Sequence, residues 1–464
     1  MDIKITFLGA AKNVTGSKYL LEANGRKYLI DCGMYQEHDL KGRNWQPSLV
    51  PPAEIDGVFL THAHLDHCGL LPRLVKEGYR GKIYATAATC ELSKIVLADC
   101  AKINEEDSKF KQKRHEKEGR QGPHPDIPLY TLPDAKEVFS LFTSVPLNQP
   151  LGLGSGIHAE FREVGHILGA TSIKFTIRDD AETRTVFFSG DVGRCNMPII
   201  RDPSPIDEAD YIVCESTYGD RLHGNSADIP TELARIINET TEAGGNLIIP
   251  SFAIERTQDL IYYLATLLKQ DRIPHLRIFV DSPMAVKVTD IFRRFPNLFD
   301  AETTKLARSI RLPGLTLVRT TADSKSINRI KGTAIIIAGA GMCTGGRIKH
   351  HLAANITRKN CTIMFVGFQA KETLGRIILE GAKNVRILGE EYPVKAKIER
   401  ISGFSAHADQ QELLGWLTTV KGTPRKVFVT HGEPEAAEAM SKVIQEKLGW
   451  QTYVPEYQET VTLN

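Results

Sequence analysis

The sequence predicts an α/β fold in which a domain built on a parallel sheet is inserted into another α/β domain. Strand-like runs separated by glycine turns fill residues 1–100 and return between about 157 and 192. Between about 228 and 382, apolar strands alternate with amphipathic helices, which is typical of βαβ units and a parallel sheet. Residues 392–464 return to short alternating strands, so we interpret the middle region as an insertion.

The length and composition agree with a globular protein of more than one domain. A chain of 464 residues can bury a substantial core in two or three domains. We expect the first domain to cover residues 1–207 and 383–464, and the inserted domain to cover 208–382. Because the net charge is only +2, nucleic-acid binding would depend on a local basic surface rather than on global charge.

Several patterns bear on the compartment. No apolar run approaches the roughly 18 residues of a membrane span. The N-terminal residues 1–9 alternate like a strand and lack the pattern of a signal peptide. The chain has 8 cysteines and no CxxC pair, which favours buried thiols in a reducing compartment over disulfides. We therefore expect a cytoplasmic protein without a membrane partner.

The elements of the first domain follow from apolar runs and turn signals. Residues 18–22 and 27–31 flank an Asn-Gly pair, which predicts a β-hairpin. Helices are expected near 68–77 and 88–103. The segment 101–125 is mixed-charge and almost free of apolar residues. We expect it to be a solvated helix end and loop, with substrate contact as the alternative.

In the inserted domain, each predicted strand leads into a helix or a glycine-containing loop. Such alternation places the strands in parallel and gathers the loops at one edge of the sheet. The predicted elements are strands at 246–250, 277–281, 334–338 and 362–366, and helices at 254–269 and 284–295.

The densest group of polar side chains lies in residues 61–67, Thr-His-Ala-His-Leu-Asp-His, directly after an apolar strand. His62 and His64 point the same way, because side chains alternate along a strand. Asp66 and His67 come where the chain turns into a helix, so they can face the same cavity from another side. A polar loop with satisfied histidines is the alternative, but three imidazoles and a carboxylate in six residues favour a metal site.

Further candidate ligands lie just beyond predicted strands, where active groups collect on a rigid scaffold. Alone, each could be a turn or cap residue. Together they complete two ligand sets: His62, His64 and His166 for one metal, and Asp66, His67 and His431 for the other, with Asp191 as the bridge.

The donor types bear on the identity of the ions. Imidazole and carboxylate without thiolate suit Zn²⁺, with Mn²⁺ as the alternative. Two such ions lower the pKa of a bound water to about 7 and neutralise charge on a substrate oxygen. We interpret Asp31, at the end of a strand, as a group that orients a ligand histidine.

Proton transfer has its own candidates. His407 lies in a loop of small residues, and Glu215 ends an apolar strand. A histidine held protonated by a carboxylate can act as a general acid for a leaving oxyanion. From spacing alone, capping roles for His407 and Glu215 are as well supported as this proton-transfer pair. Asp66 is predicted to be catalytic as well as a ligand.

The ligand candidates support a family resemblance. Asp31, the run His62–His67, His166 and Asp191 resemble, in order and context, motifs one to four of the metallo-β-lactamase superfamily. The resemblance implies an αββα sandwich that holds two Zn²⁺ ions per chain.

The remaining candidates resemble the additional motifs of one branch. Glu215, Ser405–His407 and His431–Glu433 resemble motifs A, B and C of the β-CASP branch, and the insertion has the size and α/β character of a β-CASP domain. That branch contains nucleases, among them RNA 3′-end-processing endonucleases of the cleavage and polyadenylation specificity factor type and their bacterial and archaeal relatives. The resemblance implies that Glu215 pairs with His407 near the leaving group, and His431 in motif C implies RNA rather than DNA.

Some loops of the inserted domain are candidates for substrate contact. The glycine-rich segment 338–347 follows a strand and opens a helix, so its backbone N–H groups could meet a phosphate; a packing turn is the alternative. Other loops start after strands and could stack bases or hold phosphates, with turns and caps as the alternative. The predicted substrate-binding residues are Ser251, Arg256, Gly341, Gly345, Gly346, Arg347 and Gln369.

The sequence thus predicts a zinc-dependent ribonuclease that hydrolyses phosphodiester bonds of single-stranded RNA in RNA processing or decay. Endonuclease action is favoured, with 5′-3′ exonuclease action as the alternative, and a homodimer is left open. His407 would protonate the departing 3′-oxygen and leave a 5′-phosphate. The alternatives are a small-molecule metallo-hydrolase of the thioesterase or lactonase type and a non-catalytic RNA-binding protein.

Overall fold

The computed structural model divides the chain into two compact units. Residues 1–196, 201–222 and 407–464 form the first unit, and residues 197–200 and 223–406 form the second. The structure describes residues 2–119, 124, 126–179, 181–223, 229–307, 312–330, 332–367, 369–370 and 372–464. The predicted domain boundaries at 207/208 and 382/383 stay a prediction, because the units are defined by their packing alone.

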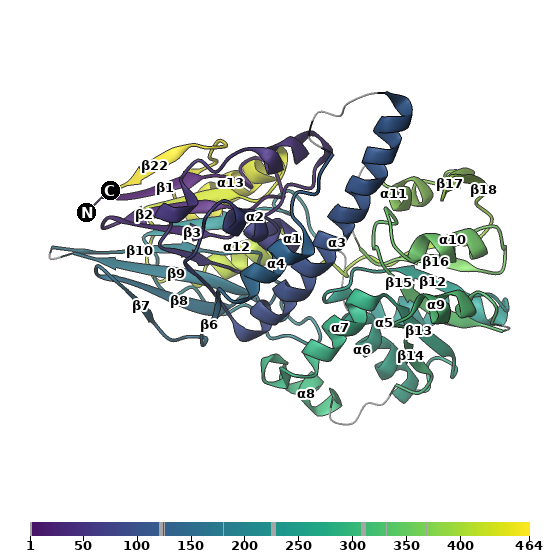
Figure 1. Ribbon diagram of the computed structural model, residues 1–464. Coiled ribbons are helices and arrows are strands. Elements are labelled where there is room, and N and C mark those ends of the chain that lie inside the picture. Colours follow the sequence, from purple (N-terminus) through teal and green to yellow (C-terminus); the bar gives the residue numbers. More distant parts are fainter. Residues whose placement is uncertain are drawn as a thin grey trace. The chain divides into compact units, whose positions relative to one another are not determined.

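The described part of the first unit contains two seven-stranded sheets (Figure 1). One has the order β22 (Thr460–Leu463), β1 (Ile3–Phe7), β2 (Tyr19–Ala23), β3 (Arg26–Ile30), β4 (Gly57–Phe59), β5 (Lys82–Ala85) and β6 (Phe142–Ser144). The other has the order β21 (Thr452–Tyr453), β20 (Lys426–Thr430), β11 (Tyr211–Glu215), β10 (Thr183–Phe188), β9 (Thr171–Arg178), β8 (Ile157–Glu163) and β7 (Leu151–Gly154).

The two sheets share one hydrophobic core. Alternate residues of their strands meet in it, as expected for strands with one buried face. Aromatic rings dominate the contact: Phe59 of β4 lies 4.9 Å from Phe175 of β9, centroid to centroid, and Phe7 of β1 lies 5.3 Å from Phe428 of β20. The sheets therefore form a rigid scaffold whose strand ends can position functional side chains.

Helices accompany both sheets of this unit. Near the first sheet run α1 (Leu65–Cys68), α2 (Leu71–Lys76), α3 (Ala87–Glu118) and α4 (Leu132–Phe139), and near the second run α12 (Gln410–Leu417) and α13 (Pro434–Leu448). Short 3-10 helices η1 (His38–Trp45) and η2 (Pro52–Glu54) join β3 to β4. The predicted αββα fold class is confirmed.

The long helix α3 corrects one prediction. It does not end near residue 103 but continues to Glu118 and closes at Gly119, whose φ is 61°. Glu, Lys and Arg are good helix formers, so an exposed charged segment can still be helical. Arg114 and Glu118 form an i,i+4 ion pair on it. Residues 120–123 and 125 of the predicted loop lie outside the described residues.

The second unit is built on a parallel sheet, as predicted. Its order is β14 (Leu315–Leu317), β13 (Arg277–Asp281), β15 (Ala334–Ala338), β12 (Leu247–Pro250), β16 (Thr362–Phe365) and β19 (Lys397–Arg400), and all neighbouring pairs are parallel. Strands β17 (Asn384–Ile387) and β18 (Glu390–Pro393) form a separate hairpin.

Helices cover both faces of this sheet. One apolar cluster joins it to α5 (Ile229–Glu242), α6 (Arg256–Lys269) and α7 (Pro283–Phe292). Two further clusters join the opposite face to α9 (Thr321–Ile327), α10 (Ile348–Asn355) and α11 (Leu374–Leu379). The described residues also include η4 (Pro296–Leu298) and α8 (Ala301–Ala307).

Further sequence predictions can be compared with the described residues. The prediction that residues 392–464 form short strands is wrong in part, because α12 and α13 lie there and β19 belongs to the second unit. Most cysteines are buried free thiols, as predicted, but Cys195 is exposed. In the part of the chain that the structure describes, no helix has the length and apolarity needed to cross a membrane.

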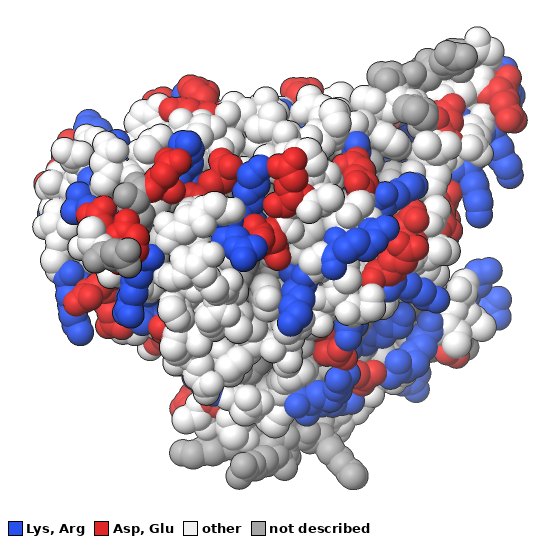
Figure 2. All heavy atoms as spheres, turned by 60° about the vertical axis from the view of Figure 1, so that its left-hand side comes forward, with Lys and Arg blue, Asp and Glu red and all other residues white. Residues whose placement is uncertain are grey.

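The charged side chains of both signs are interspersed. On the face drawn in Figure 2, blue and red side chains lie side by side over much of the surface. This agrees with the small net charge of +2. Binding of an anionic molecule would therefore depend on local groups rather than on the global charge.

Candidate metal centre

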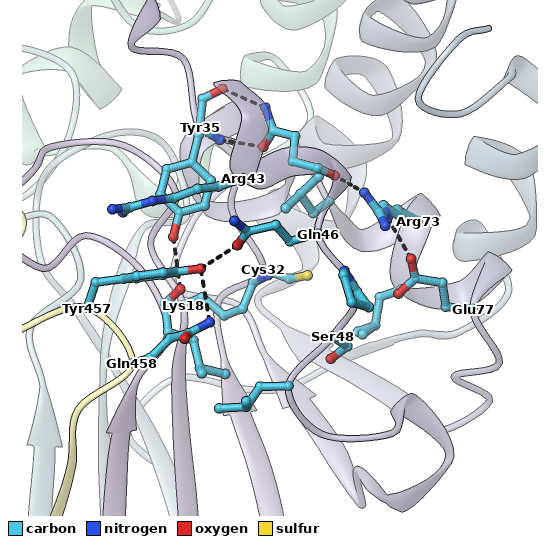
Figure 3. A pocket seen from close by; sticks show the side chains of 16 residues that line it. Lys18, Cys32, Tyr35, Arg43, Gln46, Ser48, Arg73, Glu77, Tyr457 and Gln458 are labelled. Carbon is cyan, nitrogen blue, oxygen red and sulfur yellow. Dashed lines mark hydrogen bonds and ion pairs between the residues drawn. The ribbon is translucent and has the colours of Figure 1, made fainter. Parts of the chain in front are cut away.

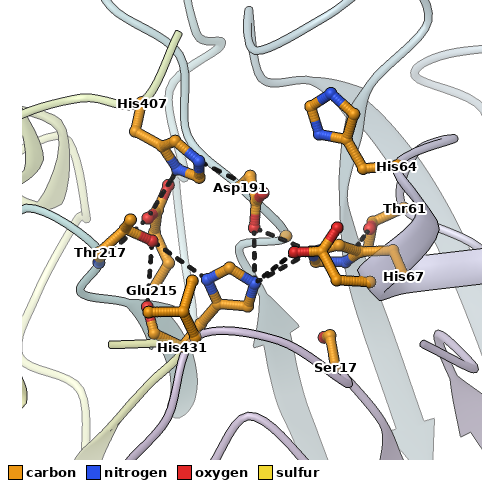
Figure 4. Close-up of polar contacts among 12 residues, drawn as sticks. Ser17, Thr61, His64, His67, Asp191, Glu215, Thr217, His407 and His431 are labelled. Carbon is orange, nitrogen blue, oxygen red and sulfur yellow. Dashed lines mark hydrogen bonds and ion pairs between the residues drawn. The ribbon is translucent and has the colours of Figure 1, made fainter. Parts of the chain in front are cut away.

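The residues predicted as ligands and proton donors lie together at the strand ends of the first unit (Figure 4). All of them except His407 follow or end an apolar strand, or lie in a helix directly after one. His62 and His64 follow β4, Asp66 and His67 lie in α1, His166 lies between β8 and β9, Asp191 follows β10, Glu215 ends β11, His407 precedes α12 and His431 follows β20.

Glycines in the left-handed conformation shape the loops that carry His166 and Asp191. Gly165, with φ 67°, precedes His166, and Gly190, with φ 57°, precedes Asp191. The two loops touch at Gly193, whose N–H donates to the carbonyl of Val164 over 2.8 Å. A Cβ on Gly193 would lie 1.8 Å from the carbonyl oxygen of Gly165, so only glycine lets the loops approach this closely.

The first ligand group joins three histidines. His62 Nε2 lies 3.0 Å from His64 Nδ1, and His166 Nε2 lies 3.2 Å from the same atom. Ligands on a tetrahedral ion with bonds of 2.0–2.1 Å are about 3.3 Å apart, so the observed spacing suits chelation. Burial lowers the pKa of His62 and of His166 well below its usual value. The rings are therefore neutral, which is the form that binds a metal.

The second ligand group joins Asp66, His67 and His431. His67 Nε2 lies 3.1 Å from His431 Nε2, and Asp66 Oδ2 lies 3.8 Å from His431 Nε2. Asp31 fixes one of these rings, since His67 Nδ1 donates to its Oδ2 over 2.7 Å. That bond directs His67 Nε2 into the cluster. Burial lowers the pKa of this imidazole, but Asp191 and Asp31 outweigh burial and raise it well above its usual value. Asp31 and His431 both adopt a positive φ, which is uncommon outside glycine and is typical of constrained functional sites.

Asp191 lies between the two groups. Its Oδ2 is 3.4 Å from His62 Nε2 and 3.5 Å from His166 Nε2. Its Oδ1 is 3.2 Å from His67 Nε2 and 3.5 Å from His431 Nε2. Each carboxylate oxygen thus faces one ligand group.

The surroundings of Asp191 fit a pair of metal ions. The carboxylate is buried, and among the described residues neither of its oxygens accepts a hydrogen bond. A buried carboxylate is costly unless it is paired with cations or coordinates a metal. Burial raises the pKa of the Asp191 carboxyl, but the surrounding histidines outweigh burial and hold it well below its usual range. The charged carboxylate and the imidazoles that face it form a donor set for Zn²⁺.

His407 and Glu215 form a pair beside these ligands. His407 Nδ1 lies 3.1 Å from both carboxylate oxygens of Glu215, and its Nε2 points to Asp191 Oδ2 at 3.8 Å. Burial opposes the charged ring, but Glu215 and Asp191 outweigh it and raise the pKa of His407 to about 9. Glu215 also accepts from the backbone N–H of Val192 over 2.6 Å, so its carboxylate is fixed on the His407 side.

Two threonines support the histidines, and sequence reasoning missed both. The hydroxyl of Thr217 donates to the carbonyl of His431 and lies 3.1 Å from His431 Nδ1. The hydroxyl of Thr61 lies 3.1 Å from His62 Nδ1 and donates to Asp31 Oδ1 and Oδ2. Their position next to predicted site residues was the only sequence signal. Such partners orient ligand rings and raise their basicity.

The predicted substrate-binding residues all lie in the second unit. Both arginines contact internal partners: Arg256 Nη1 donates to Asp259 over 2.7 Å, and Arg347 Nη1 donates to Asp281 over 2.6 Å. Ser251, Gly341, Gly345, Gly346 and Gln369 lie in loops at the carboxyl edge of the sheet. Their roles as substrate contacts stay predictions.

A separate hollow of the first unit lies next to the strand end that carries Asp31 (Figure 3). It encloses about 550 Å³, part of which is open solvent. Its arginines are engaged internally: Arg43 lies 3.8 Å above the ring centroid of Tyr457, and Arg73 pairs with Glu77 over 2.6 Å. The stacking of Arg43 on Tyr457 ties η1 to the C-terminal loop.

The fold and the histidine–aspartate cluster define a metallo-hydrolase. Models of known families match along the chain: the metallo-beta-lactamase superfamily over residues 13–220, the Beta-Casp domain over 257–378, and the Zn-dependent metallo-hydrolase RNA specificity domain over 391–455. The chain belongs to the metallo-beta-lactamase superfamily, in the nuclease branch that carries a Beta-Casp domain. The family resemblance predicted from the motifs is confirmed.

Relatives of known name match over nearly the whole chain. "Ribonuclease TTHA0252" of Thermus thermophilus is 38% identical, over 95% of this chain and 96% of its own length. "Transcription termination factor FttA" of Methanosarcina mazei is 28% identical, over 99% of this chain and 72% of its own. A crystal structure of a protein of unknown function from Enterococcus faecalis V583 has a TM-score of 0.59 and 11% identity over 100% of both chains. The last likeness shows the fold alone.

Proposed function

We propose that this protein is a zinc-dependent ribonuclease that hydrolyses phosphodiester bonds of single-stranded RNA. Two findings support RNA as the substrate. The Thermus thermophilus relative at 38% identity is named a ribonuclease, and the model over residues 391–455 describes an RNA specificity domain. The chemistry of the first unit agrees with hydrolysis at phosphorus, because its ligands suit two cations close together.

The observation that carries this proposal is the position of Asp191. Its two oxygens face separate groups of imidazoles, and neither accepts a hydrogen bond among the described residues. In our proposal His62, His64 and His166 would hold one Zn²⁺, Asp66, His67 and His431 would hold the other, and Asp191 would serve both. When bound, such ions polarise a phosphoryl oxygen and lower the pKa of a water to about 7.

The chain's own residues then orient groups and move a proton. Asp31 and Thr217 fix the rings of His67 and His431, which keeps their Nε2 atoms directed into the cluster. Glu215 holds the ring of His407 so that Nε2 faces the cluster. We propose that a hydroxide ion forms the new bond to phosphorus as the bond to the 3′-oxygen breaks. His407 Nε2 then donates its proton to the departing 3′-oxygen, which leaves a 5′-phosphate on the downstream product.

The proposal also covers the compartment in which the enzyme acts and whether it cuts RNA internally or from an end. We propose a cytoplasmic enzyme, because the mostly buried free thiols suit a reducing compartment. We propose endonuclease action, with stepwise 5′-3′ action as the alternative outcome of the test.

The test is cleavage of end-labelled single-stranded RNA carrying either a 5′-phosphate or a 5′-hydroxyl, resolved at nucleotide length. With zinc, internal fragments are expected from both RNAs, and a chelator abolishes them. Stepwise mononucleotides mean exonuclease action instead. No metal-dependent cleavage of any RNA, together with hydrolysis of thioesters or lactones, would contradict the proposal.

A further inference from the structure

We propose that Phe252 of the second unit is a base-stacking site for single-stranded RNA. The inference rests on the proposed function, since it names a subsite for the same substrate. Phe252 follows β12 and is 39% exposed, whereas the ends of its loop are buried. Three separate observations support the inference: Phe252 lies at the carboxyl end of a sheet strand, its ring packs against two glycines, and hydrogen bonds hold the surrounding loops in place.

The topology places Phe252 where parallel sheets bind ligands. After β12 the chain enters α6, whose Leu260 and Leu264 pack on one face of the sheet. After the adjacent strand β15 it enters α10, whose Ile348 and Leu352 pack on the opposite face. Because the two connections lead to opposite faces of the sheet, the carboxyl ends of β12 and β15 form a switch point of the topology, which is where ligands of such sheets bind.

The backbone is shaped around the Phe252 ring. Gly341, in the loop after β15, and Gly367, in the loop after β16, both lie against it. A Cβ at Gly341 would come within 2.7 Å of ring atom Cδ2, and a Cβ at Gly367 within 3.3 Å of Cε2. Because Gly341 has no side chain, the ring can pack against its backbone, and 39% of the Phe252 surface stays exposed. A solitary exposed aromatic needs no explanation, but one seated on the backbone of neighbouring loops does.

The loops that form this seat are fixed by buried polar contacts. Gln369, which is buried, donates from Nε2 to the carbonyl of Gly341 over 3.0 Å and to that of Gly367 over 3.4 Å. Thr257 Oγ1 donates to the carbonyl of Phe252 over 2.7 Å. The ring is thus held in place before any ligand binds, which reduces the entropy cost of stacking.

An exposed ring of this kind suits a nucleobase. Every base has a π face, so stacking on an aromatic side chain gives affinity without strict sequence choice. Phe110 offers a contrast: it is 69% exposed in the C-terminal third of α3, and the glycines described in the structure make no close contact with it. Phe110 is therefore the matched control for an exposed phenylalanine without a seat.

The test compares steady-state RNA cleavage by the full-length wild type, Phe252→Leu, Phe252→Trp and Phe110→Leu. Leucine keeps an apolar side chain but removes the π face. Phe252→Leu is expected to raise KM about 5- to 150-fold, the range for loss of one stacked base, with kcat nearly unchanged. Phe252→Trp and Phe110→Leu should keep the wild-type KM. A wild-type KM for Phe252→Leu, or a fall in kcat alone, would overturn the inference.

A walk of single abasic nucleotides along the RNA locates the contact. For the wild type, one abasic position should raise KM, and Phe252→Leu should be insensitive at that position. If all positions affect both proteins equally, Phe252 stacks on no base. Near-identical thermal midpoints for Phe252→Leu and wild type separate this effect from misfolding.

A binding measurement distinguishes failure of this inference from failure of the proposed function. In the presence of chelator, RNA carrying 2-aminopurine should lose fluorescence on binding to wild type at one position, and should not lose it with Phe252→Leu. If the wild type cleaves no RNA yet shows this quenching, the proposed nuclease activity fails and the stacking site stands. If it cleaves RNA without any quenching that depends on Phe252, the stacking site fails and the proposed function stands.

Discussion

Two buried aspartates at strand ends, Asp191 in the first unit and Asp281 in the second, differ in how their oxygens are satisfied. Asp281 accepts from Arg347 Nη1 over 2.6 Å, from Ser324 Oγ over 2.6 Å and from His351 Nε2 over 2.7 Å. Asp191 is surrounded by imidazoles, yet no hydrogen bond to it is formed by the described residues.

The same residue types therefore serve different purposes. At Asp281, a carboxylate, an imidazole, a guanidinium and a hydroxyl satisfy one another, which stabilises the loops of the sheet edge. At Asp191, donors of similar kind converge without satisfying the carboxylate, which is the arrangement that a bound cation completes. Burial and residue type are shared by the two sites, so the partners of the carboxylate oxygens distinguish a metal centre from a structural network.

The largest effect is expected from Asp191→Asn. This variant removes the charge that faces both ligand groups, so we expect less than one zinc per chain by elemental analysis. Cleavage should fall by about 1,000-fold or more, because activating water near neutral pH depends on the bound ions. Zinc should also raise the thermal midpoint of the wild type more than that of the variant. An Asp191→Asn protein that binds zinc and cleaves like wild type would show that Asp191 is not needed for metal binding.

A smaller loss is expected from His407→Ala. The variant should keep its zinc and its RNA affinity, while the single-turnover cleavage rate falls about 100- to 10,000-fold, the usual contribution of a general acid. A leaving group that needs no proton, such as 4-nitrophenol on a phosphodiester, provides the control, because its release should depend little on His407. If the cleavage rates of RNA and of the 4-nitrophenyl phosphodiester fall equally, His407 is not the proton donor to the leaving group.

The pH profile tests the His407–Glu215 pair. A general acid works while protonated, and Glu215 and Asp191 raise the pKa of His407 to about 9 against the effect of burial. Activity should therefore persist at neutral pH and fall as the pH rises through the His407 pKa. Glu215→Gln removes a charge that raises this pKa, so the alkaline limb should move to lower pH. An alkaline limb that does not move would show that Glu215 does not set the pKa of His407.

Thr217→Val should weaken zinc binding by about 10- to 100-fold, the usual effect of removing a partner of a ligand histidine. Thr217 contacts the ring of His431 through its hydroxyl, and valine keeps its shape without that group. Excess zinc should restore cleavage, and Thr217→Ser should behave as wild type in a zinc competition assay. If Thr217→Val holds zinc as tightly as wild type, the hydroxyl does not orient the ligand.

The smallest effect on cleavage is expected from Asp281→Asn, the counterpart in the second unit. It leaves Arg347 without its charged partner, so the free energy of unfolding should fall by about 3–5 kcal/mol in urea titrations. The folded protein should keep its zinc content and its cleavage rate close to wild type. A loss of zinc in Asp281→Asn with unchanged stability would reverse the roles assigned to the two aspartates.

Most of the fold could be predicted from the sequence, and so could the set of residues that the structure places in one cluster. The cluster was predictable because much of it comes from one local motif: His62 and His64 follow a single strand, and Asp66 and His67 lie in the helix directly after it. Thr217 was missed because its contact with His431 joins residues 214 positions apart and leaves no local pattern. For Arg256 and Arg347, sequence cannot distinguish a guanidinium that faces a phosphate from one that faces an internal carboxylate. The assigned roles of these residues stay predictions.

The central claim is that Asp191 bridges two metal ions, and anomalous diffraction at the zinc edge from zinc-loaded crystals tests it most directly. The account predicts two anomalous peaks, one among His62, His64 and His166 and one among Asp66, His67 and His431. Each should lie about 2.0–2.2 Å from one oxygen of Asp191. A single peak, or two peaks that Asp191 does not contact, would contradict it.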